Sequence, residues 1–154
     1  MEQKTKLTAH EGSQDLLITR VFDLPLGSLF RAFEEPSLFE QWMNTRVLKM
    51  ENANHGSYAF ETSHNGTVAF RAHGTIHEFV PNTRITRTFE MEGTPLPVQL
   101  EFLEFEELTE VTSKLTMHIV FKSVGARDQL MQMPFARGLD MAHNRLQEIA
   151  SQLK

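Results

Sequence analysis

The chain has 154 residues, a length that suits one domain with a sizeable hydrophobic core. It contains no cysteine, which excludes disulfides, thiolate catalysis, thiolate zinc sites and iron–sulfur clusters. Its formal net charge is −5 and it has no run of Lys and Arg, so we expect no nucleic-acid partner.

The sequence also argues against a membrane protein. Residues 1–15 form a polar lead-in without the apolar core of a signal peptide. No apolar stretch approaches the roughly 18 residues that a spanning helix needs. We therefore expect a cytoplasmic protein without membrane insertion, in which residues 16–154 form a single domain.

The first part of that domain predicts one strand and two short helices. Residues 16–22 are rich in β-branched and aromatic side chains, which is typical of a strand. Pro25 and Pro36 each stand where the first turn of a helix begins, and apolar residues follow both at helical spacing. The pattern predicts a helix–turn–helix insert at one end of a sheet.

From residue 46 to residue 121 the pattern changes to short alternating segments separated by turn signals such as Asn65-Gly66. No helix interrupts them, so they predict an antiparallel meander. Helical spacing returns after Pro134, where an apolar stripe from Phe135 to Leu153 predicts one long amphipathic helix. A shorter turn or helix is expected from about 126 to 131.

These elements predict an α+β fold in which a curved antiparallel sheet wraps around the long C-terminal helix. A single amphipathic helix buries its apolar stripe best across the concave face of a twisted sheet. Where the two surfaces diverge, a cavity can open between the inward strand residues and the start of the helix.

Several segments, in this order and spacing, resemble one family: residues 18–23 with Pro25, the segment from Glu35-Pro36 to Trp42, and residues 73–78. Further matches lie at 81–89, 121–128 and 138–146. The chain resembles the activator-of-heat-shock-ATPase-like branch of the START-related, or SRPBCC, helix-grip superfamily, over about residues 16–153. It departs from the family pattern at Arg87, where a hydrophobe is usual, at Met133-Pro134 and at Phe70.

The resemblance implies a START-like domain with a cavity for a small hydrophobic molecule such as a lipid, an aromatic compound or a polyketide-like compound. The superfamily includes lipid carriers, aromatase and cyclase subunits, hormone receptors and chaperone regulators, so the fold alone does not name a reaction. The alternative is a protein-interaction module that regulates a heat-shock chaperone ATPase. The chaperone activators carry an additional N-terminal domain used in binding, and this chain has only one domain, so we favour the ligand hypothesis.

Alternation and helical spacing give a set of candidate cavity residues. Trp42, the single tryptophan, lies where the family lines the cavity mouth, although packing alone would also explain a buried tryptophan. Many of the others also suit an ordinary core. The candidates are Trp42, Tyr58, Phe60, Phe70, Arg87, Phe89, Phe102, Glu104, Met117, Met131, Phe135 and Leu139.

Arg87 and Glu104 are the polar members of this set. If both point inward, they could pair with each other or bind a polar head group, because an unpaired buried charge is costly. The alternative is that local bulges turn both side chains to solvent.

Neither a metal nor a cofactor is expected. His73 and His77 lie on a predicted strand, where four residues span about 13 Å, so they cannot share one ion. His118 and His143 flank apolar positions and are expected to face outward. The sequence shows no nucleophile elbow, phosphate loop, zincin spacing or dehydrogenase fingerprint, so no catalytic residue is predicted. Whether the protein catalyses a reaction stays open, as does whether it forms a homodimer.

Overall fold

The computed structural model describes residues 4–153, and Met1, Glu2, Gln3 and Lys154 lie outside the described part. The described elements, in chain order, are β1 (Lys6–Thr8), β2 (Asp15–Phe22), α1 (Leu26–Glu34), α2 (Pro36–Met43), β3 (Arg46–Met50), β4 (Ser57–His64), β5 (Thr67–Val80), β6 (Arg84–Met91), β7 (Gln99–Thr109), β8 (Thr112–Val120), α3 (Val124–Met131) and α4 (Phe135–Ala150).

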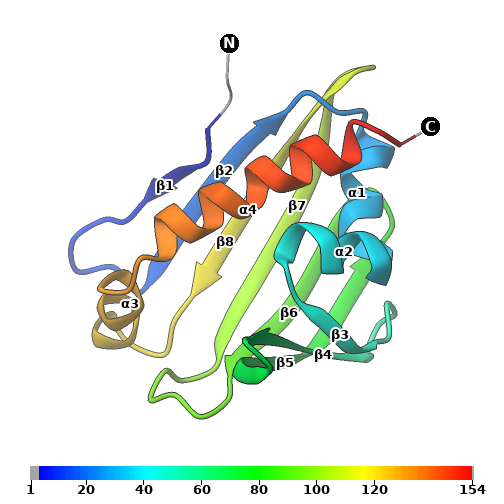
Figure 1. Cartoon of the computed structure of the whole chain (residues 1–154). Coiled ribbons are helices and arrows are strands. Elements are labelled where there is room, and N and C mark those ends of the chain that lie inside the picture. Colours follow the sequence, from blue (N-terminus) through cyan, green and yellow to red (C-terminus); the bar gives the residue numbers. More distant parts are fainter. Residues whose placement is uncertain (1–3, 154) are drawn as a thin grey trace.

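The strands form one antiparallel sheet in the order β1-β2-β8-β7-β6-β5-β4-β3. Figure 1 shows α4 lying along one face of this sheet, with α1 and α2 at one end of the helix and α3 at the other. The predicted α+β helix-grip architecture is therefore confirmed, including the pair of short helices and the long C-terminal helix. No helix within residues 4–153 is both long and apolar enough to cross a bilayer.

The polar lead-in contains one element that the sequence did not predict. Residues 6–8 form an edge strand, β1, which pairs antiparallel with β2 and sets Leu7 opposite Ile18. The strand is short, and only Leu7 in it is partly buried. Tertiary pairing thus orders a segment whose own composition is polar.

Local sequence explains the two short helices. Pro25 is the N-cap residue of α1, and Pro36 is the first residue of α2, where a proline costs no hydrogen bond. Asn44 ends α2 in the left-handed conformation with φ 54°, which asparagine tolerates better than most residues. The Trp42 Nε1 donates a 2.7 Å hydrogen bond to the Ala32 carbonyl, which fastens α2 to α1.

Three irregularities bend the outer strands of the sheet. The register shifts between Val47 and Lys49 in β3, between Thr62 and Ser63 in β4, and between Ile76 and Glu78 in β5. Such bulges bend a strand and increase its twist. In Figure 1, β3, β4 and β5 lie on the same side of α4 as α2, at the far edge of the sheet from β1.

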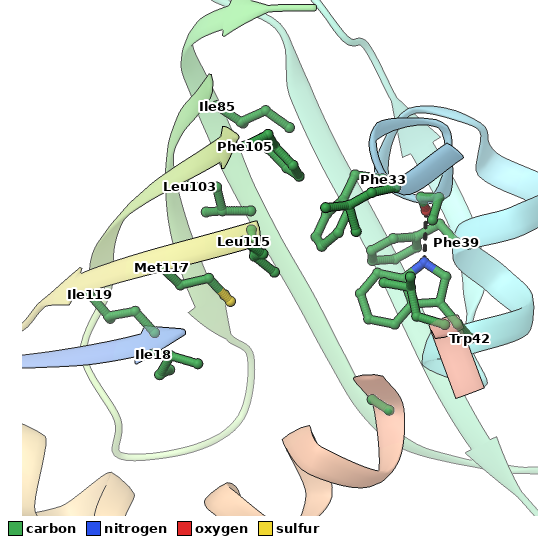
Figure 2. Packing of buried hydrophobic residues seen from close by; sticks show 14 of the residues in the cluster. Ile18, Phe33, Phe39, Trp42, Ile85, Leu103, Phe105, Leu115, Met117 and Ile119 are labelled. Atoms are coloured by element: carbon green, nitrogen blue, oxygen red, sulfur yellow. Dashed lines mark hydrogen bonds between the residues drawn. The ribbon is translucent and has the colours of Figure 1, made fainter. Parts of the chain in front are cut away.

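The core lies between α4, α1, α2 and the concave face of the sheet. Leu146 of α4 is fully buried, as are Ile18 of β2 and Leu115 of β8. Figure 2 shows the aliphatic side chains of β2, β7 and β8 opposite the aromatic rings of Phe33 and Trp42. Burial of this face stabilises the fold because it removes large apolar side chains from water.

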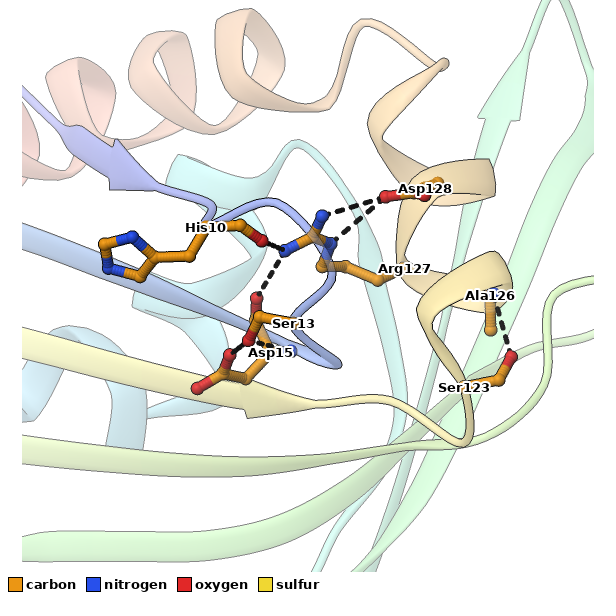
Figure 3. A network of polar contacts seen from close by, with 7 residues as sticks. All are labelled: His10, Ser13, Asp15, Ser123, Ala126, Arg127 and Asp128. Atoms are coloured by element: carbon orange, nitrogen blue, oxygen red, sulfur yellow. Dashed lines mark hydrogen bonds and ion pairs between the residues drawn. The ribbon is translucent and has the colours of Figure 1, made fainter.

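A polar network fixes α3 to the loop that precedes β2 (Figure 3). The buried Arg127 side chain donates from Nη1 to the His10 carbonyl at 2.6 Å and from Nη2 to the Asp128 carboxylate at 2.9 Å. The Ser123 Oγ accepts the backbone N–H of Ala126 at 3.0 Å and caps the helix. Because Arg127 Nη1 also donates to the Asp15 carbonyl at 3.4 Å, this network ties β2, α3 and the N-terminal loop together.

Candidate functional site: a cavity between the last helix and the sheet

A partly enclosed cavity of about 110 Å³ lies between α4, α2 and the concave face of the sheet. Its wall is mostly apolar and contains Phe33, Phe39, Trp42, Met43, Phe60, Arg87, Phe89, Gln99, Glu101, Met117, Ile119, Phe135, Leu139 and His143. We call it the inner cavity. An apolar space of this size is several times larger than one water molecule requires.

A second, more open cavity of about 370 Å³ adjoins it at the N-terminal end of α4. We call it the outer cavity. Met43, Phe135 and Leu139 line both cavities, so these three side chains stand between them. Phe70 of β5 lines the outer cavity only.

Most of the residues predicted from the sequence come together here. Seven of them line the inner cavity: Trp42, Phe60, Arg87, Phe89, Met117, Phe135 and Leu139. Tyr58 is buried directly beside them and stacks on Phe60 with ring centroids 6.2 Å apart. Met131 is partly buried against the core on α3 and does not contribute to either cavity wall.

Two predicted residues point the other way. Phe102 stacks on His118 with centroids 6.0 Å apart, and Glu104 is exposed, whereas Glu101 and Leu103 are buried. The inward assignment of Phe102 and Glu104 was therefore wrong. The sequence from Leu100 to Phe105 repeats an apolar, acidic, apolar triplet, so alternation fits either face, and a shift of one residue exchanges the two faces.

Arg87 does point inward, but its partner is Glu101, which is opposite Arg87 in the β6–β7 register. The Arg87 Nε donates to the Glu101 Oε1 at 3.0 Å, with the two side chains 16% and 5% exposed. The Gln99 amide donates to the other oxygen of Glu101 at 2.8 Å. Because each oxygen of the buried carboxylate accepts a hydrogen bond, the pair can be buried without an unsatisfied charge.

The Tyr58 ring supports the other side of the guanidinium. The Arg87 Cζ lies 5.1 Å from the ring centroid, a distance typical of a cation–π contact. Burial by itself lowers the pKa of Arg87, but Tyr58 and Glu101 more than offset this and hold that pKa above its ordinary value. Burial also raises the pKa of the Tyr58 phenol well above its usual range, so the ring stays neutral.

A glycine makes the position of Tyr58 possible. The Tyr58 hydroxyl donates to the Thr88 carbonyl at 2.6 Å, across the strand that carries Gly74. A Cβ atom on Gly74 would lie 2.0 Å from the Thr88 oxygen and 2.7 Å from the Tyr58 hydroxyl. Only a residue without a side chain leaves room for this close approach.

His143 is the functional candidate that the sequence interpretation missed. It was expected to face outward, but it is 1% exposed and lines the inner cavity. Its ring packs edge-on to Phe22 at 5.7 Å between centroids, and its Nδ1 lies 2.7 Å from the Thr5 hydroxyl. The signal was its spacing, four residues after Leu139 and three before Leu146, which places it on the apolar stripe.

Burial, and next the nearby charge of Arg20, lowers the pKa of His143 to about 3. The imidazole is therefore neutral at pH 7. Thr5 is tied to α4 a second time, because its backbone N–H donates to Asp140 at 3.0 Å. The segment before β1 thus holds the outer edge of the histidine ring while the opposite side faces the cavity.

Other cavity residues were not among the sequence candidates: Phe33, Phe39, Met43, Gln99, Glu101, Ile119 and His143. Within residues 4–153, no three His, Asp or Glu side chains are grouped so that they could hold a metal ion. His73 contacts Glu92 on the surface, with its Nδ1 3.0 Å from the carboxylate. The polar groups of the cavity lining are thus a neutral histidine, the Gln99 amide and the ion pair of Arg87 with Glu101.

The sequence matches the family model described as Activator of Hsp90 ATPase homolog 1-like protein over residues 23–151. The chain belongs to this family. The cavity wall, from Phe33 to His143, lies inside the matched region. No curated protein matches the sequence.

Solved structures share the whole fold. Protein Ms6760 from Mycobacterium smegmatis superposes with a TM-score of 0.85 at 17% identity, over 98% of this chain and 99% of that one. A Rhodobacter sphaeroides protein superposes with a TM-score of 0.85 at 18% sequence identity, over 97% of this chain and 100% of that one. An Arthrobacter aurescens protein superposes with a TM-score of 0.85 at 17% sequence identity, over 96% of this chain and 92% of that one. At these identities the likeness shows the fold alone.

Proposed function

We propose that the protein binds a small, mainly apolar molecule in the inner cavity, with the outer cavity as its route of entry. The observation that supports this most strongly is the partly enclosed space of about 110 Å³, whose wall consists mainly of aromatic, aliphatic and methionine side chains. Protein cores are normally close-packed, and a void of this kind costs stability. A cavity kept at this cost is best explained by a ligand that fills it.

The residues between the two cavities suit this role. Met43, Leu139 and Phe135 are only partly buried, and Phe135 is the first residue of α4. Small rotations of these side chains would connect the inner and outer cavities without unfolding the helix. Aromatic and methionine walls adapt to ligands of different shape.

A cavity-filling substitution tests the proposal. Leu139→Trp inserts a large ring between the two cavities, whereas Leu17→Trp places the same ring on β2 at a position that is 41% exposed. We expect the fluorescent probe aminoanthracene to bind the wild-type protein and the Leu17→Trp control equally, and Leu139→Trp at least about tenfold more weakly. Equal binding by all three proteins would contradict the proposal.

Regulation of a heat-shock chaperone ATPase is the alternative, and the family description supports it. It predicts that the purified protein binds the cognate chaperone in a pull-down and changes its ATPase rate. A rate unchanged at saturating protein would count against it. Because Leu139→Trp changes the cavity and not the exposed face, the same variant would keep chaperone binding if this alternative held.

A further inference from the structure

The inner cavity is mostly apolar, and its polar lining residues are Arg87 of β6, Gln99 and Glu101 of β7, and His143 of α4. The hydrogen-bonding atoms already in use are easily identified. The Trp42 N–H is donated to Ala32, and the Gln99 amide N–H is donated to Glu101. Both oxygens of Glu101 accept a hydrogen bond, one from Gln99 and one from Arg87. What a ligand meets therefore depends on the donors that are not in use.

Arg87 is the first of these donors. Glu101 holds its Nε, and the Tyr58 ring lies against its guanidinium carbon at 5.1 Å. Within residues 4–153, no side chain or carbonyl accepts a hydrogen bond from its Nη1 or Nη2. The guanidinium is thus fixed on two sides, with its outer nitrogens available in the cavity wall.

His143 is the second donor, and its tautomer follows from its neighbours. The Thr5 hydroxyl accepts a hydrogen bond from Arg20 Nη1 at 3.3 Å. Because Arg20 already donates to this oxygen, we assign the Thr5 hydroxyl as the donor in its 2.7 Å contact with His143 Nδ1. Nδ1 therefore accepts, and since the ring is neutral, its proton is on Nε2. A histidine on α4 and an arginine on β6 then offer N–H groups to the same cavity.

The charges in the cavity lining cancel. Arg87 and Glu101 form a pair, and His143 is uncharged. The cation in this lining, Arg87, is already paired with Glu101, and Glu101 would repel an anionic ligand. The hydration that such a ligand loses on binding would therefore not be offset by an attraction inside the cavity. A neutral acceptor meets the two donors without this cost.

We infer that the ligand is a neutral apolar molecule with a carbonyl oxygen, which is bound between Arg87 and His143 while its apolar part contacts the aromatic wall. This inference rests on the proposed function and adds the chemical class of the ligand. Arg87, held by Glu101 and Tyr58, and His143, held by Thr5, act as the residues that determine specificity. A molecule of the same shape without the oxygen leaves both donors unpaired and binds more weakly.

Three dyes of one scaffold test the inference: Prodan, a neutral naphthyl ketone; its analogue with a propyl group in place of the propionyl group; and its carboxylic acid analogue. For the wild-type protein we expect Prodan to bind about tenfold more tightly than either analogue. The infrared carbonyl stretch of bound Prodan should lie at lower frequency than in an apolar solvent, as a hydrogen-bonded carbonyl requires.

Two variants remove the donors and one serves as the control. Arg87→Met combined with Glu101→Gln removes the guanidinium without leaving a buried charge, and His143→Phe keeps a ring of similar size. Each should weaken Prodan binding about tenfold, change the propyl analogue by less than about twofold and raise the carbonyl frequency. Met117→Leu, which alters the wall without a polar group, should affect both dyes alike.

The outcomes separate the two proposals. If no dye binds the wild-type protein, the proposed ligand-binding function is wrong. If the propyl analogue binds as tightly as Prodan, or if the donor variants weaken both dyes equally, the apolar site stands and the carbonyl assignment is overturned. Tighter binding of the carboxylic acid would overturn the claim that the ligand is neutral.

Discussion

Leu146 and Phe135 both belong to the apolar stripe of α4, but the structure gives them different surroundings. Leu146 is fully buried against the sheet, in the close-packed part of the core. Phe135 is partly buried at the first turn and lines both cavities. Truncation of each to alanine therefore compares a packed position with a position beside a space that already exists.

The expected magnitudes follow from this difference. Leu146→Ala removes a fully buried side chain and leaves a new void, which costs about 2–5 kcal/mol of unfolding free energy. Phe135→Ala loses the burial of only part of its ring, and the space it leaves joins the inner and outer cavities instead of forming a new one. We expect it to cost about 1–2 kcal/mol, because only the transfer of buried apolar area contributes.

Urea unfolding of both variants measures the free energies, and titration with aminoanthracene measures binding. Leu146→Ala should lower the unfolding midpoint more and leave probe affinity unchanged below the transition. Phe135→Ala should lower the unfolding midpoint less and change the affinity for the probe by about threefold or more. If Phe135→Ala were as destabilising as Leu146→Ala and left probe binding unchanged, Phe135 would be a core residue and the reasoning about the cavity would fail.

Three further predictions concern stability. In the folded protein His143 has a pKa of about 3 and is neutral, whereas in the unfolded chain it titrates near 6.5. As the pH falls from 6.5 to 5, the unfolded chain binds a proton at this position and the folded protein does not, so the unfolding free energy should fall by about 2 kcal/mol. Unfolding of His143→Gln at the two pH values should lack this loss, and an equal loss would contradict the neutral assignment. Gly74→Ala should cost at least about 2 kcal/mol in urea unfolding, because its Cβ would meet the Thr88 carbonyl at 2.0 Å, and a smaller cost would refute that constraint. Ser123→Ala should cost about 1 kcal/mol by loss of the α3 cap, whereas Ser151→Ala, past the end of α4, should leave thermal stability nearly unchanged.

Apart from the edge strand β1, the sequence by itself determined the kinds of element and their order. Pro25 and Pro36 mark the starts of two helices, and the apolar stripe after Pro134 marks the long C-terminal one, because local backbone restriction and helical spacing are properties of a few neighbouring residues. The absence of cysteine excluded whole classes of chemistry through composition alone. The family resemblance was likewise visible in short motifs and is confirmed by the match over residues 23–151.

Only the tertiary structure decided which side chains meet in the cavity. In β7 the repeated triplet suits either face, and pairing with β6 and β8 selected the one that buries Glu101 and exposes Glu104. Arg87 therefore pairs with Glu101, a choice that depends on register between strands and not on spacing along one. His143 faces inward because Thr5, 138 residues earlier in the chain, lies beside it in the fold and satisfies its outer nitrogen. A polar residue on an apolar stripe can be buried once such a partner is present, and that partner is supplied by long-range packing that no local pattern encodes.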